Sequence, residues 1–160
     1  MPSDNGEGLN SFNWMEYLTL AEYITGFGSR EPSREALCRS AISRAYYSVL
    51  CYSRNYLLRA GELIPEELTS GSSHEVIIQR WIKGRDKMWR KVGVDLNRLR
   101  RYRKRADYED EYNNIERELH LSLKYARRIF EILESLESVS YTHLRAHETS
   151  LHLVCRLLLE

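Results

Sequence analysis

The stretch that decides the fold is residues 34–60, REALCRSAISRAYYSVLCYSRNYLLRA. Its apolar residues recur every three or four positions: Leu37, Ala41, Ala45, Val49 (or Ser48) and Tyr52. This period is that of one face of an α-helix. Ser33 precedes the stretch as a favourable N-cap, and Gly61 follows it as a common C-terminal stop. We therefore expect one long amphipathic helix over 34–60.

Working outward, apolar residues at helical spacing predict four more helices. They cover about 14–25, 73–83, 86–106 and 115–136, and Gly-, Pro- or Ser-containing turns separate them. Gly93 lies inside the fourth helix, where it costs about 1 kcal/mol relative to Ala. No segment shows the two-residue alternation of a half-buried strand. The sequence thus predicts an all-α bundle of about five helices.

The C-terminal segment has a different character. Residues 139–149, VSYTHLRAHET, and 153–160, LVCRLLLE, resemble in-frame translations of a transposase-type sequencing-library adapter. Such segments are excluded from fold reasoning, so the histidines and the cysteine there carry no functional weight. We expect a flexible polar leader over 1–11, one helical domain over 12–138 and a non-native tail over 139–160.

Composition limits the kinds of ligand and the cellular compartment expected for this domain. The chain has 24 Lys and Arg against 23 Asp and Glu, so its net charge of +1 alone does not indicate nucleic acid. Cys38 and Cys51 lie 13 positions apart on one predicted helix, about 20 Å along its axis, and cannot form a disulfide together. No apolar stretch approaches the length of a membrane span. We expect a cytoplasmic protein without membrane contact, cofactor or metal site.

Basic residues are concentrated in one part of the chain. Residues 80–105 hold twelve Lys or Arg but only two acids. One interpretation is a phosphate-binding face, with Trp81, Trp89 and Tyr102 available to stack on bases. The other is a solvated helix face that pairs with the acidic run 107–118. Six basic residues surround most of the helix, too many for one acidic segment to neutralise: Arg98, Arg100, Arg101, Arg103, Lys104 and Arg105. This favours the first interpretation.

Two strings mix guanidinium groups with phenols. They are Ser43-Arg44-Ala45-Tyr46-Tyr47-Ser48 and Arg103-Lys104-Arg105-Ala106-Asp107-Tyr108. Together with His74, which opens a middle helix, they resemble the HEPN family over about residues 14–136. HEPN domains are small helical bundles that include many RNA-cleaving toxins. The resemblance therefore implies a basic Arg/Tyr cleft that binds RNA or a nucleotide, with Arg44, Tyr47 and the basic residues of the second string in it.

The resemblance also implies a chemistry and partners. HEPN ribonucleases act without metal at a dimer interface and carry an Arg followed four to six residues later by His. Here Arg103 takes the place of the phosphate-binding Arg, but Tyr108 stands where His is expected, and a phenol is a poor base at neutral pH. Asp107 is the remaining candidate for a base. We expect a homodimer, and a nucleotidyltransferase-type antitoxin is the partner implied for a toxin–antitoxin module.

Three functions therefore stay open at this level. The first is a binding module for RNA or nucleotide, the second an active metal-independent endoribonuclease, and the third a structural dimerisation module. Arg44 borders the apolar stripe, so we expect it either in the cleft beside Arg103 and Tyr108 or in a structural salt bridge to Asp107. Tyr46 and Tyr47 are expected as core or interface aromatics. His74 is expected to be an ordinary first-turn residue.

Overall fold

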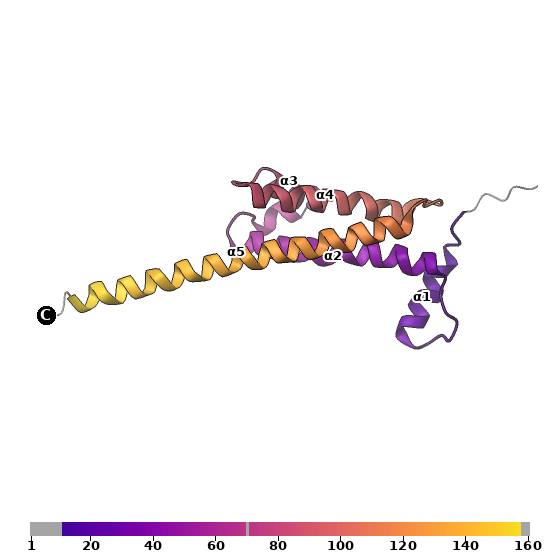
Figure 1. The fold of residues 1–160 in the computed structure, drawn as a ribbon, viewed down its shortest axis with the longest axis horizontal. Helices are drawn as coiled ribbons and strands as arrows, with labels where there is room; N and C mark the ends of the chain where they lie inside the picture. Colours follow the sequence, from indigo (N-terminus) through magenta and orange to yellow (C-terminus); the bar gives the residue numbers. More distant parts are fainter. Residues whose placement is uncertain (1–10, 70, 158–160) are drawn as a thin grey trace, which may run out of the picture.

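The computed structural model describes residues 11–69 and 71–157, and from residue 139 on it describes the backbone alone. The described residues form five α-helices and one short 3-10 helix, without a strand (Figure 1). The elements are α1 (Met15–Thr25), α2 (Arg34–Arg59), η1 (Pro65–Leu68), α3 (Ser73–Ile82), α4 (Lys87–Tyr108) and α5 (Ile115–Leu157). The predicted all-α fold of about five helices is confirmed.

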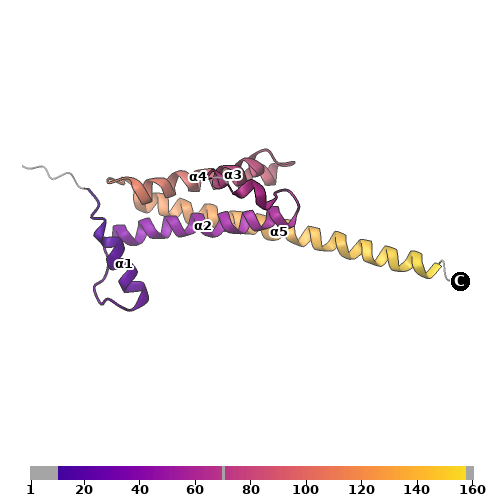
Figure 2. The ribbon, with the colours of Figure 1, turned by 180° about the vertical axis from the view of Figure 1, so that it is seen from behind.

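Helix α2 is the centre of the bundle. It packs against both α4 and α5, while α3 covers α4, and the views from the two sides agree on this arrangement (Figures 1 and 2). The shared core is built from aliphatic and aromatic side chains of all four helices, such as Val49, Ile78, Trp81, Leu96 and Ile129. In contrast, α1 lies beside the start of α2 and points away from the bundle.

The buried face of α2 is rotated from the predicted stripe. Ala45 and Val49 are buried as expected, but Leu37, Ala41 and Tyr52 are only partly buried. The fully buried positions of α2 include Ile42, Tyr46, Val49 and Leu57. They also include two polar residues, Arg39 and Ser53. Because α4 and α5 both pack on α2, its inward face is wider than one apolar stripe.

Local signals fix the helix ends and one close contact. Ser33 Oγ accepts a hydrogen bond from the Ala36 N–H at 3.2 Å, and Asp86 caps the start of α4. Helix α4 is continuous through Gly93, although the sequence pattern weakened there. A Cβ at Gly93 would lie 2.5 Å from the Ile82 backbone nitrogen. Glycine is therefore needed for the close approach of α3 to α4.

Helix α5 runs further than the sequence pattern predicted. It continues to Leu157 rather than ending near residue 136, and its last part extends beyond the bundle (Figure 1). The expected leader falls almost entirely on residues 1–10, which lie outside the described residues. None of the described helices is long and apolar enough to cross a membrane.

Candidate RNA-binding site

Arg103, near the end of α4, is the centre of the candidate site. Its Nε lies 2.6 Å from Asp107 Oδ2, one helical turn further on. Its Nη2 donates a hydrogen bond to Tyr47 Oη on α2 at 2.7 Å. The guanidinium carbon is 5.2 Å from the ring centroids of both Tyr47 and Tyr108. Two phenol rings, a hydroxyl and a carboxylate therefore hold this cation in one orientation.

Held in this way, the Arg103 guanidinium stays positively charged and still has N–H donors for a ligand. Burial lowers the pKa of Arg103, but Asp107, Tyr47 and Tyr108 outweigh it and raise the pKa overall. A guanidinium has five N–H donors, more than its contacts with Asp107, Tyr47 and Tyr108 engage. The side chain is 16% exposed, so it reaches the surface. Arg103 can therefore bind an anion without losing its own supports.

Asp107 links α4 to α2 through Ser43 rather than through Arg44. Ser43 Oγ donates to Asp107 Oδ2 at 3.3 Å. The predicted salt bridge between Arg44 and Asp107 is wrong, because one helical position turns Arg44 by about 100° away from Ser43. Arg44 is exposed and has no hydrogen bond or ion pair with any described residue. It lies one turn before Tyr47, on the rim of the site.

His74 lies beside the candidate site, although an ordinary first-turn residue was expected at this position. Its Nδ1 lies 3.1 Å from Tyr46 Oη, and its ring centroid lies 5.8 Å from that of Tyr47. Burial, and then the positive charges of Arg100 and Arg103, lower the pKa of His74 below its usual 6.5. The imidazole is therefore neutral at neutral pH. Only its place at the start of α3 could have pointed to it, since nothing in its local sequence ties it to Arg103.

The remaining basic residues fall on different sides of α4. Arg100 pairs with Glu75 of α3, and Lys104 is exposed nearby, so both lie toward the Arg103 side. In contrast, Arg98 and Arg105 face α5. Arg98 contacts Asp95 at 3.4 Å and the ring of Tyr125.

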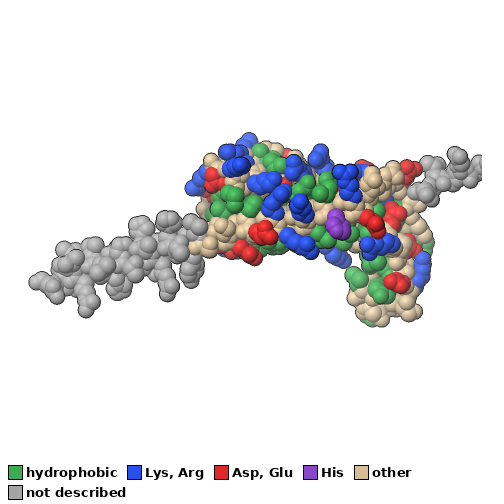
Figure 3. Space-filling model, in the orientation of Figure 1, with side chains coloured by type: hydrophobic (Ala, Val, Ile, Leu, Met, Phe, Trp, Pro, Cys, Tyr) green, Lys and Arg blue, Asp and Glu red, His purple; other side chains and the backbone are tan. Residues whose placement is uncertain are grey.

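Arg105 pairs with Glu109 and, at 2.6 Å, with Glu118. The acidic run thus neutralises part of the basic segment, as one interpretation expected. Arg101 points to solvent between the two sides. Lys and Arg side chains accordingly spread over the face that α4 and α5 present in Figure 3. The predicted basic residues therefore do not form a single cleft.

A buried arginine supports the end of α4 that carries Asp107 and Tyr108. Arg39 of α2 is fully buried, and its Nη1 donates to the carbonyl oxygens of Ala106 at 2.9 Å and Glu109 at 2.7 Å. Its Nε donates to Glu35 at 2.8 Å. The cation thus binds the last carbonyls of α4, where the helix dipole favours positive charge. The arginine of α2 that is buried at this junction is therefore Arg39, whereas Arg44 is exposed.

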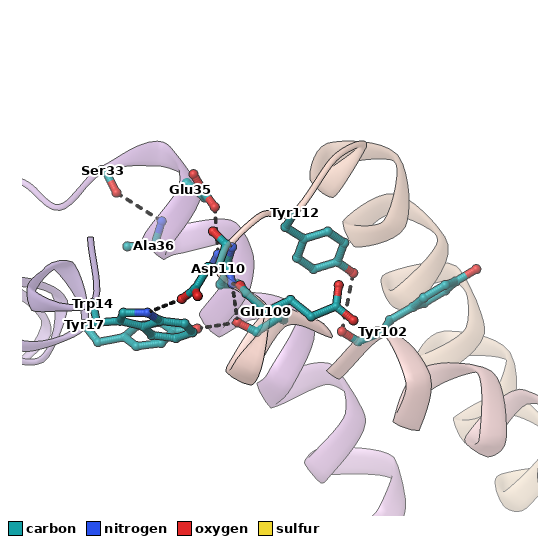
Figure 4. Close-up of polar contacts among 11 residues, drawn as sticks. Trp14, Tyr17, Ser33, Glu35, Ala36, Tyr102, Glu109, Asp110 and Tyr112 are labelled. Atoms are coloured by element: carbon teal, nitrogen blue, oxygen red, sulfur yellow. Dashed lines mark hydrogen bonds and ion pairs between the residues drawn. The ribbon is translucent and has the colours of Figure 1, made fainter. Parts of the chain in front are cut away.

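The N-terminal segment also contacts the end of α4 and the connection that follows it (Figure 4). Tyr17 Oη donates to the Ala106 carbonyl oxygen at 2.9 Å, and Trp14 Nε1 donates to Asp110 Oδ1 at 2.8 Å. On the other side, Tyr112 Oη donates to Glu118 and to the carbonyl oxygen of Tyr102. These contacts fix the connection between α4 and α5 against α1 and α2.

The comparison with known protein families identifies the domain. The HEPN domain model matches residues 29–136. The chain belongs to the HEPN domain family. The match includes all of α2, α3 and α4, and with them Tyr47, His74 and Arg103, whereas α1 lies outside it. No curated protein and no solved structure matches the chain. In the part of the chain that is described, no group of three or more His, Cys, Asp or Glu side chains could hold a metal ion.

Proposed function

We propose that this HEPN domain binds RNA or a nucleotide through the Arg103 cluster, defined as Arg103, Tyr47, Asp107 and Tyr108. The observation that supports it is the orientation of the Arg103 guanidinium, which is held on three sides and keeps donors for a phosphate. A planar fork of this kind binds phosphate in a bidentate manner. Arg44, Arg101 and Lys104 add positive charge around it. Arg98, Arg100 and Arg105 contribute less because acids already neutralise them.

The test is RNA binding by fluorescence anisotropy at fixed salt concentration. Arg103→Ala should weaken binding by about 1–3 kcal/mol, the range for a contact to a charged group. Arg103→Lys should recover only part of this, because a point charge cannot reproduce the fork. Arg117→Ala, an exposed arginine of α5, is the matched control and should change affinity little. Equal affinities for wild type and Arg103→Ala would contradict the proposal and favour a structural dimerisation module.

The position of His74 favours a second candidate, metal-independent RNA cleavage. A neutral imidazole can take the proton from a ribose 2′-hydroxyl. The 2′-oxygen then attacks phosphorus to form a 2′,3′-cyclic phosphate, and the 5′-oxygen leaves and takes a proton from water. Arg103 stabilises the charge on the phosphoryl oxygens. Asp107 is less suited as the base because Arg103 and Ser43 already engage it. The substitution Tyr108→His would place a histidine five residues after Arg103, which is within the spacing of Arg and His in the family's ribonucleases.

Cleavage of a mixed RNA pool in EDTA separates the two candidates. If the domain only binds, wild type leaves the RNA intact, and Tyr108→His creates or raises cleavage because imidazole titrates near neutral pH. If the domain is a ribonuclease, wild type cleaves and His74→Ala abolishes cleavage. Strong wild-type cleavage that Tyr108→His leaves unchanged would overturn the binding function in favour of the enzyme.

We further propose the setting in which the domain acts. It works as a cytoplasmic homodimer and as one module of a toxin–antitoxin pair, with a nucleotidyltransferase-type protein as its antitoxin. The family resemblance supports this assignment. The functional domain covers residues 12–138, and residues 139–160 are a non-native addition that contributes nothing to the site.

A further inference from the structure

A cavity of about 300 Å³ opens beside the Arg103 cluster, between α2 and the start of α3. Its lining combines rings, aliphatic side chains and one cation: Tyr47, Leu50, Cys51, Arg54, His74 and Ile77. Leu50 and Ile77 are 3% and 2% exposed, so they form an apolar floor. The cavity reaches the lower end of the size range of small-ligand sites, which are mostly apolar with a few polar groups.

Tyr47 joins this cavity to the candidate phosphate site. Its ring lines the cavity, while its hydroxyl accepts the hydrogen bond from Arg103. The rings of Tyr47 and His74 meet nearly edge to face, with an interplanar angle of 78°. A group attached to a phosphate on Arg103 would therefore enter a space walled by two aromatic rings. Aromatic walls of this kind bind nucleobases by stacking.

A second cation lies at the other end of the cavity. Arg54 follows Tyr47 by seven positions on α2, two helical turns or about 10.5 Å along the axis. Its Nε and Nη2 donate to the Asn55 side-chain oxygen, at 3.1 and 2.9 Å. No carboxylate of the described residues pairs with it, so its charge is not neutralised. Cations at both ends suit a strand that carries a phosphate on either side of the inserted base.

We propose that this cavity takes one unpaired nucleobase of a single-stranded RNA whose neighbouring phosphate lies on Arg103. The inference rests on the proposed RNA-binding function and adds the form of the substrate. A duplex is excluded, because its paired bases are stacked inside the helix and cannot enter a pocket without being flipped out. The surface cations alone would not distinguish single-stranded from double-stranded RNA, since both carry phosphates.

Cys51 provides a reporter inside the cavity. It is exposed and lines the pocket, whereas Cys38 is buried. The full chain is treated with N-ethylmaleimide, and peptide mass spectrometry follows Cys51 separately from the other two cysteines. A single-stranded eight-nucleotide RNA at saturation should slow Cys51 labelling at least fivefold. An abasic oligonucleotide of the same length, which keeps the phosphates, and a duplex should not slow it. If AMP protects Cys51 as well as the RNA does, the ligand is a mononucleotide and the proposal of a single-stranded RNA is overturned.

Filling the cavity gives an independent measurement by anisotropy. Cys51→Trp should lower the affinity for the single-stranded RNA at least tenfold, to the level of the abasic strand, while Cys51→Ser should leave it unchanged. If RNA binding depends on Arg103 but the abasic strand binds equally well and Cys51 stays unprotected, the cavity inference falls and the proposed function stands. If no strand binds the wild-type chain, both fall together.

Discussion

The position of each arginine on α2 decides whether its side chain is buried in the bundle or exposed to a ligand. Arg39 and Arg44 are five positions apart, yet the first is fully buried and the second exposed. Arg39 stays charged in the core because Glu35 and three backbone carbonyls surround it. Ring faces add to this support, since Phe12 lies 4.3 Å from the guanidinium carbon. Arg44 has no such surroundings and is available to a ligand.

His74 should make stability depend on pH. Its pKa in the folded chain lies below the usual 6.5, so the unfolded chain binds the proton more strongly. The stabilisation is complete above about pH 6.5 and is lost as the pH falls toward the folded-state pKa. Urea unfolding between pH 8 and 5 should show this loss in wild type. His74→Gln should flatten that part of the profile, whereas His120→Gln, on exposed α5 surface, should not. A profile that His74→Gln leaves unchanged would contradict the assignment.

Part of the site could be predicted from the sequence. Arg103 and Asp107 stand four positions apart, so their pairing follows from the geometry of one helix. Tyr47 and His74 come to Arg103 only through the packing of α2, α3 and α4, and no local spacing specifies that. Arg39 was missed for a similar reason, because its partners are backbone carbonyls of a distant helix end and leave no side-chain pattern.

At the scale of the helix, the approach of α3 to α4 depends on Gly93. In an isolated helix Gly93→Ala would stabilise by about 1 kcal/mol. Here the added methyl group would overlap Ile82 and the Trp81 backbone, so we expect a net destabilisation of about 1–3 kcal/mol, the usual cost of overpacking. Urea unfolding measures it. Gly71→Ala, where a Cβ meets nothing within 4 Å, is the control and should be nearly neutral. A stabilised Gly93→Ala variant would show that α3 can move aside.

The junction between α2 and the end of α4 depends on Arg39. Arg39→Met keeps much of the side-chain volume, but it leaves the Glu109 carbonyl without its side-chain donor and the Ala106 carbonyl with Tyr17 as its one remaining side-chain donor. We expect a loss of about 3–5 kcal/mol in the free energy of unfolding, as for breaking a buried ionic contact. Arg34→Met on the same helix breaks only an exposed pair with Glu116 and should cost about 0–1 kcal/mol. Similar costs for the two variants would refute a structural role for Arg39.

Helix positions were more predictable than helix faces. The caps at Ser33 and Asp86 and the apolar period placed all five α-helix starts within a few residues, because these signals are local. The inward face of α2 was predicted less well, since it depends on two neighbouring helices at once. Residues 107–114 were expected to connect two helices, but α4 continues to Tyr108, and Arg39 helps to hold this end of the helix.

At the scale of the whole molecule, the apolar surface that lacks a partner is on α1 and not on α2. Apolar residues are spread around most of α2, but α4, α5 and α3 pack against this helix within one chain. On α1 and the turn after it, four large apolar side chains are exposed: Met15, Leu18, Ile24 and Phe27. Phe27 is 91% exposed. Met15 and Leu18 are three positions apart, so they lie next to each other on one side of α1. Exposed apolar side chains that adjoin one another are typical of an interaction site.

We therefore expect the proposed homodimer to depend on α1. Light scattering at tens of micromolar should give twice the 19.0 kDa of one chain. The double substitution Met15→Glu and Leu18→Glu should give one chain, because burying two carboxylates in an apolar contact is costly. Leu123→Glu, at an exposed site on α5, is the matched control and should stay dimeric. A chain ending at Ser138 should also stay dimeric and melt within a few degrees of the full chain. A wild-type mass of one chain would refute the dimer, and a dimer that survives the double substitution would move its interface away from α1.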